Sequence, residues 1–194
     1  HALRAEEETA VAIRISPDSG SSEGSQSGLL RQSDALVFEH RTNLSPGLDS
    51  FVGRRAEVEE LSSLAKSGTR LITLTGPGGV GKTRLARLVG QSLVDHFSGG
   101  VWFCDLSAIR AKNGVFTAVA SALGVKLIGS NPELELRNAI ASRGGVLIIL
   151  DNFEQVLEWG PATVGQWLSG VPECSFLVTS RASLAIQGEH IVPL

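Results

Sequence analysis

Apolar residues follow two alternating kinds of pattern from about residue 43 onward. Short continuous apolar runs of strand length alternate with longer stretches in which apolar residues recur every three or four positions. Because buried strands separated by helices are typical of parallel sheets, the pattern predicts an α/β fold with a mainly parallel five-stranded sheet flanked by helices. The predicted strands are 71–75, 101–106, 146–151 and 175–179, with the start of a fifth at 191–194.

Helical patterns precede the first of these runs and lie in the first two intervals between them. Apolar spacing predicts helices over 55–66, 85–97 and 116–123, the last ended by Gly124. A further helix is expected after Asn131, which has the side chain of an N-capping residue and is followed by a first-turn proline. Predicted helices therefore follow the first two predicted strands, as right-handed crossovers between parallel strands require.

The first 42 residues lack this alternation. Residues 11–15 have the alternating pattern of a single strand, and residues 16–35 are rich in Ser and Gly, which is typical of a flexible linker. We therefore expect a tail and linker over 1–42, as a remnant of an upstream effector domain, and one folded domain over 43–194. The chain contains no Met and begins with His1, so we expect it to be a segment of a longer protein.

A phosphate-binding loop is predicted at residues 76–83. These residues are Gly76, Pro77, Gly78, Gly79, Val80, Gly81, Lys82 and Thr83, and they lie between a predicted strand and a predicted helix. Glycines let several backbone N–H groups point at one anion, and the new helix adds the positive end of its dipole. Lys82 can reach the β- and γ-phosphates, and the Thr83 hydroxyl can bind Mg²⁺.

Asp151 is the second candidate metal ligand. It ends the apolar run 146–151, and ligands bind at the carboxyl ends of strands in open α/β sheets. An Asp in this place can simply end a strand and cap the next helix. Together with the loop, it is favoured as the residue that holds Mg²⁺ opposite Thr83.

Composition narrows the class of protein. The 194 residues are 42% hydrophobic and 19% charged, which suits a folded domain, and a net charge of −3 predicts no nucleic-acid contact from this segment. No apolar run approaches the roughly 20 residues of a membrane helix. The only cysteines, Cys104 and Cys174, lack metal-ligand spacing, and Cys104 is expected to be a buried thiol. A cytoplasmic location is the simplest expectation.

The order of the motifs resembles one family. The motifs are Asn43 to Pro46, Phe51 to Arg54, the loop 76–83, Gly100 to Phe103, Leu150 to Glu154, Val178 to Arg181, and Gly188-Glu189. This order is similar to the signal-transduction ATPases with numerous domains, in the NB-ARC (AP-ATPase) branch, and to the bacterial form found in large transcriptional regulators. The resemblance covers about residues 43–194.

The resemblance implies a role for several residues. Val52, Gly53 and Arg54 would lie against adenine and ribose, and Arg181 would face the γ-phosphate as a sensor; without the resemblance, an arginine at position 181 would be taken as a solvated loop residue. ATP or ADP with Mg²⁺ would be the ligands. Self-association in the ATP state and contacts with other domains of the parent chain would follow. The family's lid and winged-helix subdomain would lie beyond residue 194.

One position departs from the family pattern. Many relatives have an acid directly after the metal-binding Asp, where this chain has Asn152, and an amide is a poor base. Glu154 is the nearest carboxylate, although it is also a candidate for the start of a helix. We therefore expect slow ATP hydrolysis, and from the sequence alone an Asn152→Asp change should raise turnover.

Four functions fit the motifs to different degrees. A nucleotide-dependent switch module, with Lys82 and Arg181 sensing the γ-phosphate, is favoured. A motor or remodelling ATPase would share this core, and an ADP-holding interaction scaffold would fit Asn152. A small-molecule phosphotransferase would need an acceptor pocket and a lid, for which no signature is found. Binding of guanine is disfavoured because the chain has no Asn-Lys-x-Asp motif.

Overall fold

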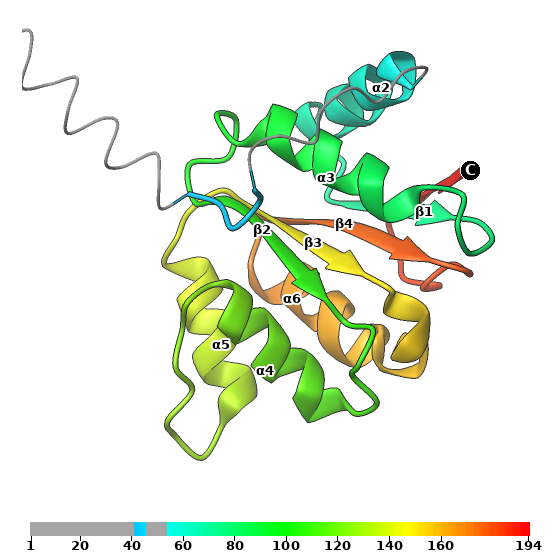
Figure 1. Cartoon of the computed structure of the whole chain (residues 1–194). Helices are drawn as coiled ribbons and strands as arrows, with labels where there is room; N and C mark the ends of the chain where they lie inside the picture. The colour runs from blue at the N-terminus through cyan, green and yellow to red at the C-terminus, as the bar shows by residue number, and fades with distance from the viewer. Residues whose placement is uncertain (1–40, 46–53) are drawn as a thin grey trace, which may run out of the picture.

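A computed structural model describes residues 41–45 and 54–194 (Figure 1). Five strands form one sheet in the order β2-β3-β4-β1-β5, and every neighbouring pair is parallel. The predicted α/β fold with five strands is confirmed: the bounds of β1 and β3 match those predicted, and those of the other three strands differ by one or two residues. The strands are β1 (Leu71–Thr75), β2 (Gly100–Asp105), β3 (Val146–Asp151), β4 (Cys174–Ser180) and β5 (Glu189–Pro193).

Helices cover both faces of this sheet. Figure 1 shows α2 and α3 on one face and α4, α5 and α6 on the other. The helix predicted to reach Phe97 ends at Leu93, although Phe97 is still buried. The helices are α2 (Arg55–Lys66), α3 (Lys82–Leu93), α4 (Lys112–Ala122), α5 (Pro132–Ala141) and α6 (Gln166–Gly170), with short turns η1 (Phe153–Gln155), η2 (Leu157–Trp159) and η3 (Pro161–Gly165).

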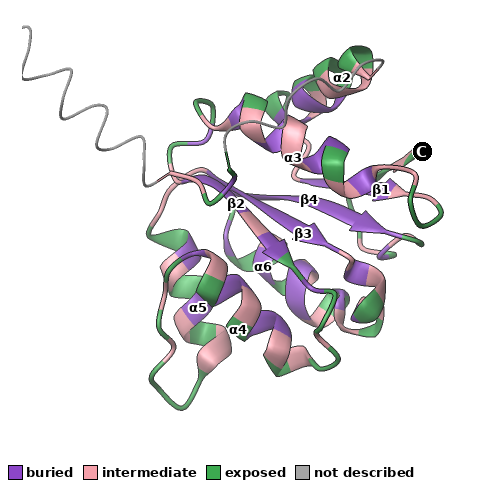
Figure 2. Ribbon diagram, viewed as in Figure 1, coloured by how far each residue is buried: buried purple, intermediate pink, exposed green. Residues whose placement is uncertain are grey.

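Two hydrophobic cores lie on the two sides of the sheet. Along β3, Ile148 and Leu150 pack with the α4–α6 side, whereas Leu147 and Ile149 pack with α2 and α3. Successive strand side chains point to opposite faces, so one apolar run supplies both cores. The strand β3 is buried along its whole length, as Figure 2 shows for the centre of the sheet.

The outer edge of β2 is covered by the segment that precedes α2. Val101 donates its backbone N–H to the carbonyl of Arg41 at 2.9 Å, and Thr42 forms a parallel bridge with the same strand residue. The side chain of Asn43 continues this pairing, because its amide both donates to and accepts from the backbone of Phe103 at 2.7 Å. Residues 41–43 therefore pair with this edge of the sheet.

The parallel arrangement brings the carboxyl ends of all five strands to one edge of the sheet. The loop after β1 and the polar residues that end β2, β3 and β4 therefore lie at the same edge. Val52 and Gly53, the segment 46–51, and the strand and linker expected within residues 1–40 lie outside the described residues. Within the described ranges, no helix is long and apolar enough to cross a membrane.

Candidate functional site

The loop from Gly76 to Gly81 connects β1 directly to α3. Gly79 and Gly81 have φ angles of 80° and 96°, a left-handed conformation that residues with a side chain rarely adopt. Gly81 is also the residue that precedes the first turn of α3, which begins at Lys82. The loop thus curls over the amino end of a helix whose first N–H groups and dipole favour an anion.

Lys82 lies within the curve of this loop. Its side chain is buried, and its ammonium group donates to the carbonyls of Gly76 at 2.8 Å and Pro77 at 2.9 Å. These partners are neutral backbone groups of the loop itself. A phosphate would offer the ammonium group charged oxygen acceptors in the same place, which bind a cation more strongly than carbonyls do.

Thr83 and Asp151, the two predicted metal ligands, contact each other next to the loop. The Thr83 hydroxyl lies 2.8 and 3.0 Å from the two carboxylate oxygens of Asp151, and the Thr179 hydroxyl donates to the same carboxylate at 2.5 Å. Asp151 is only 3% exposed. Hydroxyl and carboxylate oxygens are the ligands that Mg²⁺ prefers, and few protein ligands are needed when phosphates and water complete its octahedron. Among the described residues, no cluster of three or more His, Cys, Asp or Glu side chains could bind a metal without such help.

Asn152 extends this network toward the neighbouring strand. Its backbone has a φ angle of 60°, and its N–H donates to the Thr179 hydroxyl at 3.1 Å. Its side-chain nitrogen lies 3.1 Å from an oxygen of Asp151 and 3.1 Å from an oxygen of Asp105. Asp105 ends β2 in register with Asp151 at the end of β3. Four polar residues from three adjacent strands are therefore joined by hydrogen bonds.

Asp105 is a site residue that sequence reasoning missed. The signal was present, because Asp105 also ends an apolar run at the carboxyl edge of the sheet. Partial burial tends to raise the pKa of its carboxyl group. Hydrogen bonds from the backbone and side chain of Ser107 and from Asn152, with the positive charge of Arg87, outweigh burial and hold this pKa below its usual range.

Arg181 and Glu154 lie beside the loop. The Arg181 guanidinium is 3.4 Å from the Glu154 carboxylate, and a methyl group added at Gly78 would lie 3.6 Å from the same guanidinium. The arginine side chain is 68% exposed, whereas that of Glu154 is 18% exposed. Glu154 lies in the short turn η1, so it starts no α-helix, and it contacts the arginine. This places the predicted sensor within reach of a ligand on the loop.

Arg54 also contacts the loop. Its guanidinium donates to the carbonyl of Val80 at 3.0 Å and lies 3.7 Å from Glu57. The residues expected to line adenine with Arg54, Val52 and Gly53, lie outside the described residues. The structure therefore places one of the three expected adenine-side residues against the loop.

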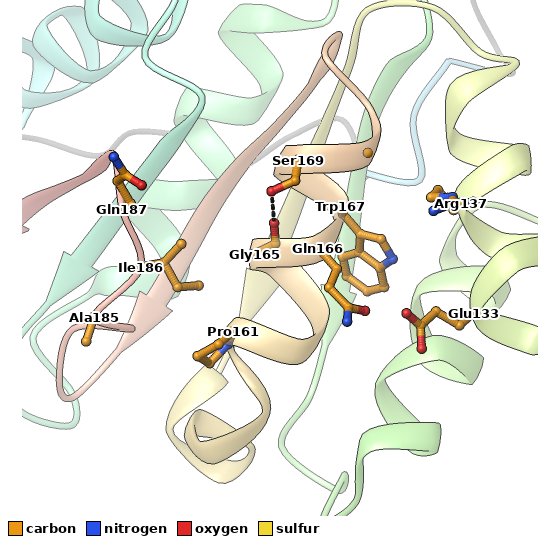
Figure 3. Close-up of a pocket in the computed structure, with 11 residues that line it drawn as sticks. Glu133, Arg137, Pro161, Gly165, Gln166, Trp167, Ser169, Ala185, Ile186 and Gln187 are labelled. Carbon is orange, nitrogen blue, oxygen red and sulfur yellow. Dashed lines mark hydrogen bonds between the residues drawn. The ribbon is translucent and has the colours of Figure 1, made fainter.

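A separate hollow of about 650 Å³ lies away from the loop, between α5, the η3–α6 segment and the residues before β5 (Figure 3). Arg137, Trp167 and Ile186 line it, and its wall is held by a hydrogen bond from the Ser169 hydroxyl to the carbonyl of Gly165 at 2.9 Å. An adjoining hollow contains residues 68–71, at the amino end of β1. These two hollows contain none of the predicted site residues.

Comparison with known sequences finds related regulators. Residues 50–169 match the family described as AAA ATPase domain. An uncharacterized protein of Mycobacterium tuberculosis is 34% identical over 142 residues, which cover 73% of this chain and 36% of that protein. A putative HTH-type transcriptional regulator of the same organism is 37% identical over 121 residues, covering 62% of this chain and 13% of the regulator. The regulatory protein AfsR of Streptomyces griseus is 34% identical over 157 residues, which cover 74% of this chain and 16% of AfsR. The chain thus spans about a third or less of the length of these relatives.

Two solved structures share the fold. A signal-transduction ATPase with numerous domains and a tetratricopeptide repeat sensor, from Pyrococcus horikoshii, superposes with a TM-score of 0.50 and 16% identity over 78% of this chain and 24% of that chain. A chain from the structure of Drosophila ORC bound to DNA superposes with a TM-score of 0.52 and 20% identity, over 74% of this chain and 42% of that chain. At these identities the likeness establishes the P-loop ATPase fold.

Proposed function

The chain belongs to the AAA ATPase domain family, and from this premise we propose that it is the ATP- and ADP-binding switch module of a multidomain signalling or transcriptional regulator. The observation that carries the proposal is the arrangement around the loop 76–81. The buried ammonium group of Lys82 lies inside the loop, and the Thr83–Asp151 pair lies directly beneath it. Phosphate contacts and oxygen ligands for a metal are therefore within one small site.

Magnesium would be held by Thr83 and Asp151. When bound, Mg²⁺ neutralises charge on the β- and γ-phosphates. The two side chains would exchange their mutual hydrogen bond, 2.8 Å long, for contacts with the ion or with its water. Lys82 would leave the carbonyls of Gly76 and Pro77 for phosphate oxygens. Both changes replace contacts within the protein by contacts with the ligand.

Sensing of the γ-phosphate is assigned to Arg181. It pairs weakly with Glu154 and lies beside Gly78, so a γ-phosphate would compete with that carboxylate for the guanidinium. A switch needs such contacts that differ between ATP and ADP. We propose that ADP stabilises a closed state and that ATP favours self-association and altered contacts with other domains of the parent chain.

Assignment to the NB-ARC branch is part of this proposal. It is supported by the order of motifs from Asn43 to Glu189 and by transcriptional regulators among the relatives. Hydrolysis is proposed to be slow, because position 152 has an amide and general-base help is typically worth about 10²–10⁴-fold. The same observation favours one alternative, a scaffold that holds ADP without turnover.

Binding of a fluorescent ADP analogue tests the proposal. We expect Lys82→Ala to weaken binding by about 100-fold or more, because the lysine supplies a charged contact to the β-phosphate. Lys66→Ala is the matched control, since Lys66 is an exposed lysine at the far end of α2. ATP should displace the analogue better than GTP. Equal affinity of wild type and Lys82→Ala would contradict the assignment of the loop.

A further inference from the structure

The side-chain amide of Asn152 lies between two carboxylates. Its nitrogen is 3.1 Å from Asp105 and 3.1 Å from Asp151. An ionised carboxylate only accepts hydrogen bonds, so the NH₂ group donates one hydrogen to each of them. The amide oxygen, which is an acceptor, is therefore turned away from both carboxylates.

The position of this amide is fixed from several directions. Its backbone has a left-handed φ of 60°, which Asn tolerates better than most residues, and its N–H is bound by the Thr179 hydroxyl. Asp105 is itself held, because the same oxygen that accepts from Asn152 also accepts from the backbone N–H of Ser107 at 2.8 Å. Without Asp105, one carboxylate contact would remain, and the amide could rotate about its last bond.

We propose that Asp105 is a positioning residue for ATP hydrolysis that acts through Asn152; this inference rests on the proposed function. Asp105 holds the amide nitrogen, so that the amide oxygen accepts a hydrogen bond from the attacking water. The negative charge comes from the end of β2, and the contact with water comes from the residue after β3. The two residues together orient the water, which is one part of what an acid at position 152 would do; they do not take its proton.

The step that they serve is in-line attack by water. The water oxygen forms a bond to the γ-phosphorus, and the bond from that phosphorus to the bridging oxygen breaks. The electron pair of the broken bond stays on the β-phosphate of ADP, and both water protons end on the released phosphate as H₂PO₄⁻. Asn152 takes no proton in this step, because an amide orients the water without acting as a base.

This arrangement reverses the effect expected for Asn152→Asp. A carboxylate at position 152 would face Asp105 and Asp151 with no hydrogen to donate, so two hydrogen bonds would become two repulsive contacts. Asp105→Ala would remove the oxygen that accepts from both Asn152 and Ser107, whereas an Asn at position 105 could still accept through its amide oxygen. The exchange Asp105→Asn with Asn152→Asp restores one acid and one amide across the two strands.

Steady-state phosphate release with Mg²⁺ and ATP tests the inference on the full chain. We expect Asp105→Ala and Asn152→Asp each to lower kcat by about 10- to 100-fold, since small displacements of reacting groups have effects of this size. The exchange variant should recover most of the loss. ADP affinity should stay within about threefold of wild type in all three. Asp95→Asn, an exposed acid beyond the far end of α3, is the control and should behave as wild type.

Several outcomes would overturn the inference. They are wild-type kcat in Asp105→Ala, a faster enzyme in Asn152→Asp, or an exchange variant no better than Asn152→Asp. No detectable turnover by the wild type would also overturn it, while leaving nucleotide binding intact. Failure of the wild type to bind ADP would instead remove the proposed function, so the two failures are told apart by the binding measurement.

Discussion

The two ends of the sheet use polar side chains in different ways. At the carboxyl end, Lys82, Thr83 and Asp151 bond to one another or to the loop, through contacts that a phosphate or a metal ion could replace. At the amino end, the Arg70 guanidinium donates to the carbonyls of Leu168 and Val171 at 2.7 Å, and to a third carbonyl at 3.1 Å. A ligand could replace the contacts of the first set, whereas the contacts of the second are made by the fold alone.

Two arginines show this difference between the ends of the sheet most clearly. Arg70 lies where three backbone carbonyls converge at the end of α6 and the start of β4, so its partners exist only in the folded protein. Arg181 is mostly exposed and has one carboxylate 3.4 Å away. An exposed ion pair contributes little to stability, and it leaves the guanidinium available to a competing anion. The same residue type thus stabilises the fold at one end and is available for ligand binding at the other.

Arg70→Ala should give the largest change in stability. Three hydrogen bonds to carbonyls would be lost, each worth about 1 kcal/mol, so the free energy of unfolding should fall by about 3 kcal/mol. Urea denaturation measures this change. The free energy of unfolding of Arg70→Lys should lie between those of wild type and Arg70→Ala, because an ammonium group can reach fewer of the carbonyls at once. ADP affinity under native conditions should not change. Unaltered stability in Arg70→Ala would remove the contrast between the two ends.

Arg181→Ala should have a smaller effect of a different kind. We expect the ratio of ATP to ADP affinity to fall by about tenfold, because one charged contact to the γ-phosphate is lost. Stability should stay within about 0.5 kcal/mol of wild type, as is usual for exposed positions. Competition titrations with the two nucleotides measure the ratio, and Arg137→Ala on α5 is the control. A ratio unchanged from wild type would argue against the sensor role.

Each end of the sheet contains one cysteine, so thiol reactivity measures how readily each end opens. We expect the smallest of the predicted effects in this measurement. Cys104 lies near the carboxyl end of β2, and Cys174 begins β4 at the amino end. Burial, with the nearby charge of Asp105, raises the pKa of the Cys104 thiol to about 12, and burial also raises the pKa of Cys174. At pH 8 we therefore expect both thiols of the folded protein to react slowly with a thiol reagent.

In Arg70→Ala, Cys174 should become a few-fold more reactive than Cys104, because its carbonyl loses the arginine N–H at 3.1 Å. Mass spectrometry of labelled peptides separates the two sites, and equal rates would mean that the two ends open together.

The raised pKa of the Cys104 thiol also makes the stability of the folded protein depend on pH. The folded state holds the Cys104 proton more tightly than the unfolded chain, whose thiol has a pKa of 9.0. The stability that comes from this difference in pKa is fully present below pH 9.0 and is lost as the pH rises toward 12.

Local patterns in the sequence determined the strands, most of the helices and the loop, but not α6 (Gln166–Gly170). The strand β3 was visible as a continuous apolar run ending in Asp151, and the loop 76–83 was visible because its residues are consecutive. The α2 helix was predicted with its observed bounds, Arg55–Lys66. Such features depend on neighbours a few positions apart, so period, caps and glycines are sufficient to predict them.

The tertiary structure decided which distant residues meet. Asp105 and Asn152 are 47 positions apart, and they touch because β2 lies next to β3 with Asp105 opposite Asp151. The contact of Arg181 with Glu154 likewise depends on β4 lying beside β3. Strand order and register are set by how both cores pack, and short-range patterns do not contain that information. For this reason the sequence alone showed only that position 152 has an amide in place of an acid. The fold was needed to show that the carboxylate of Asp105 lies beside that amide.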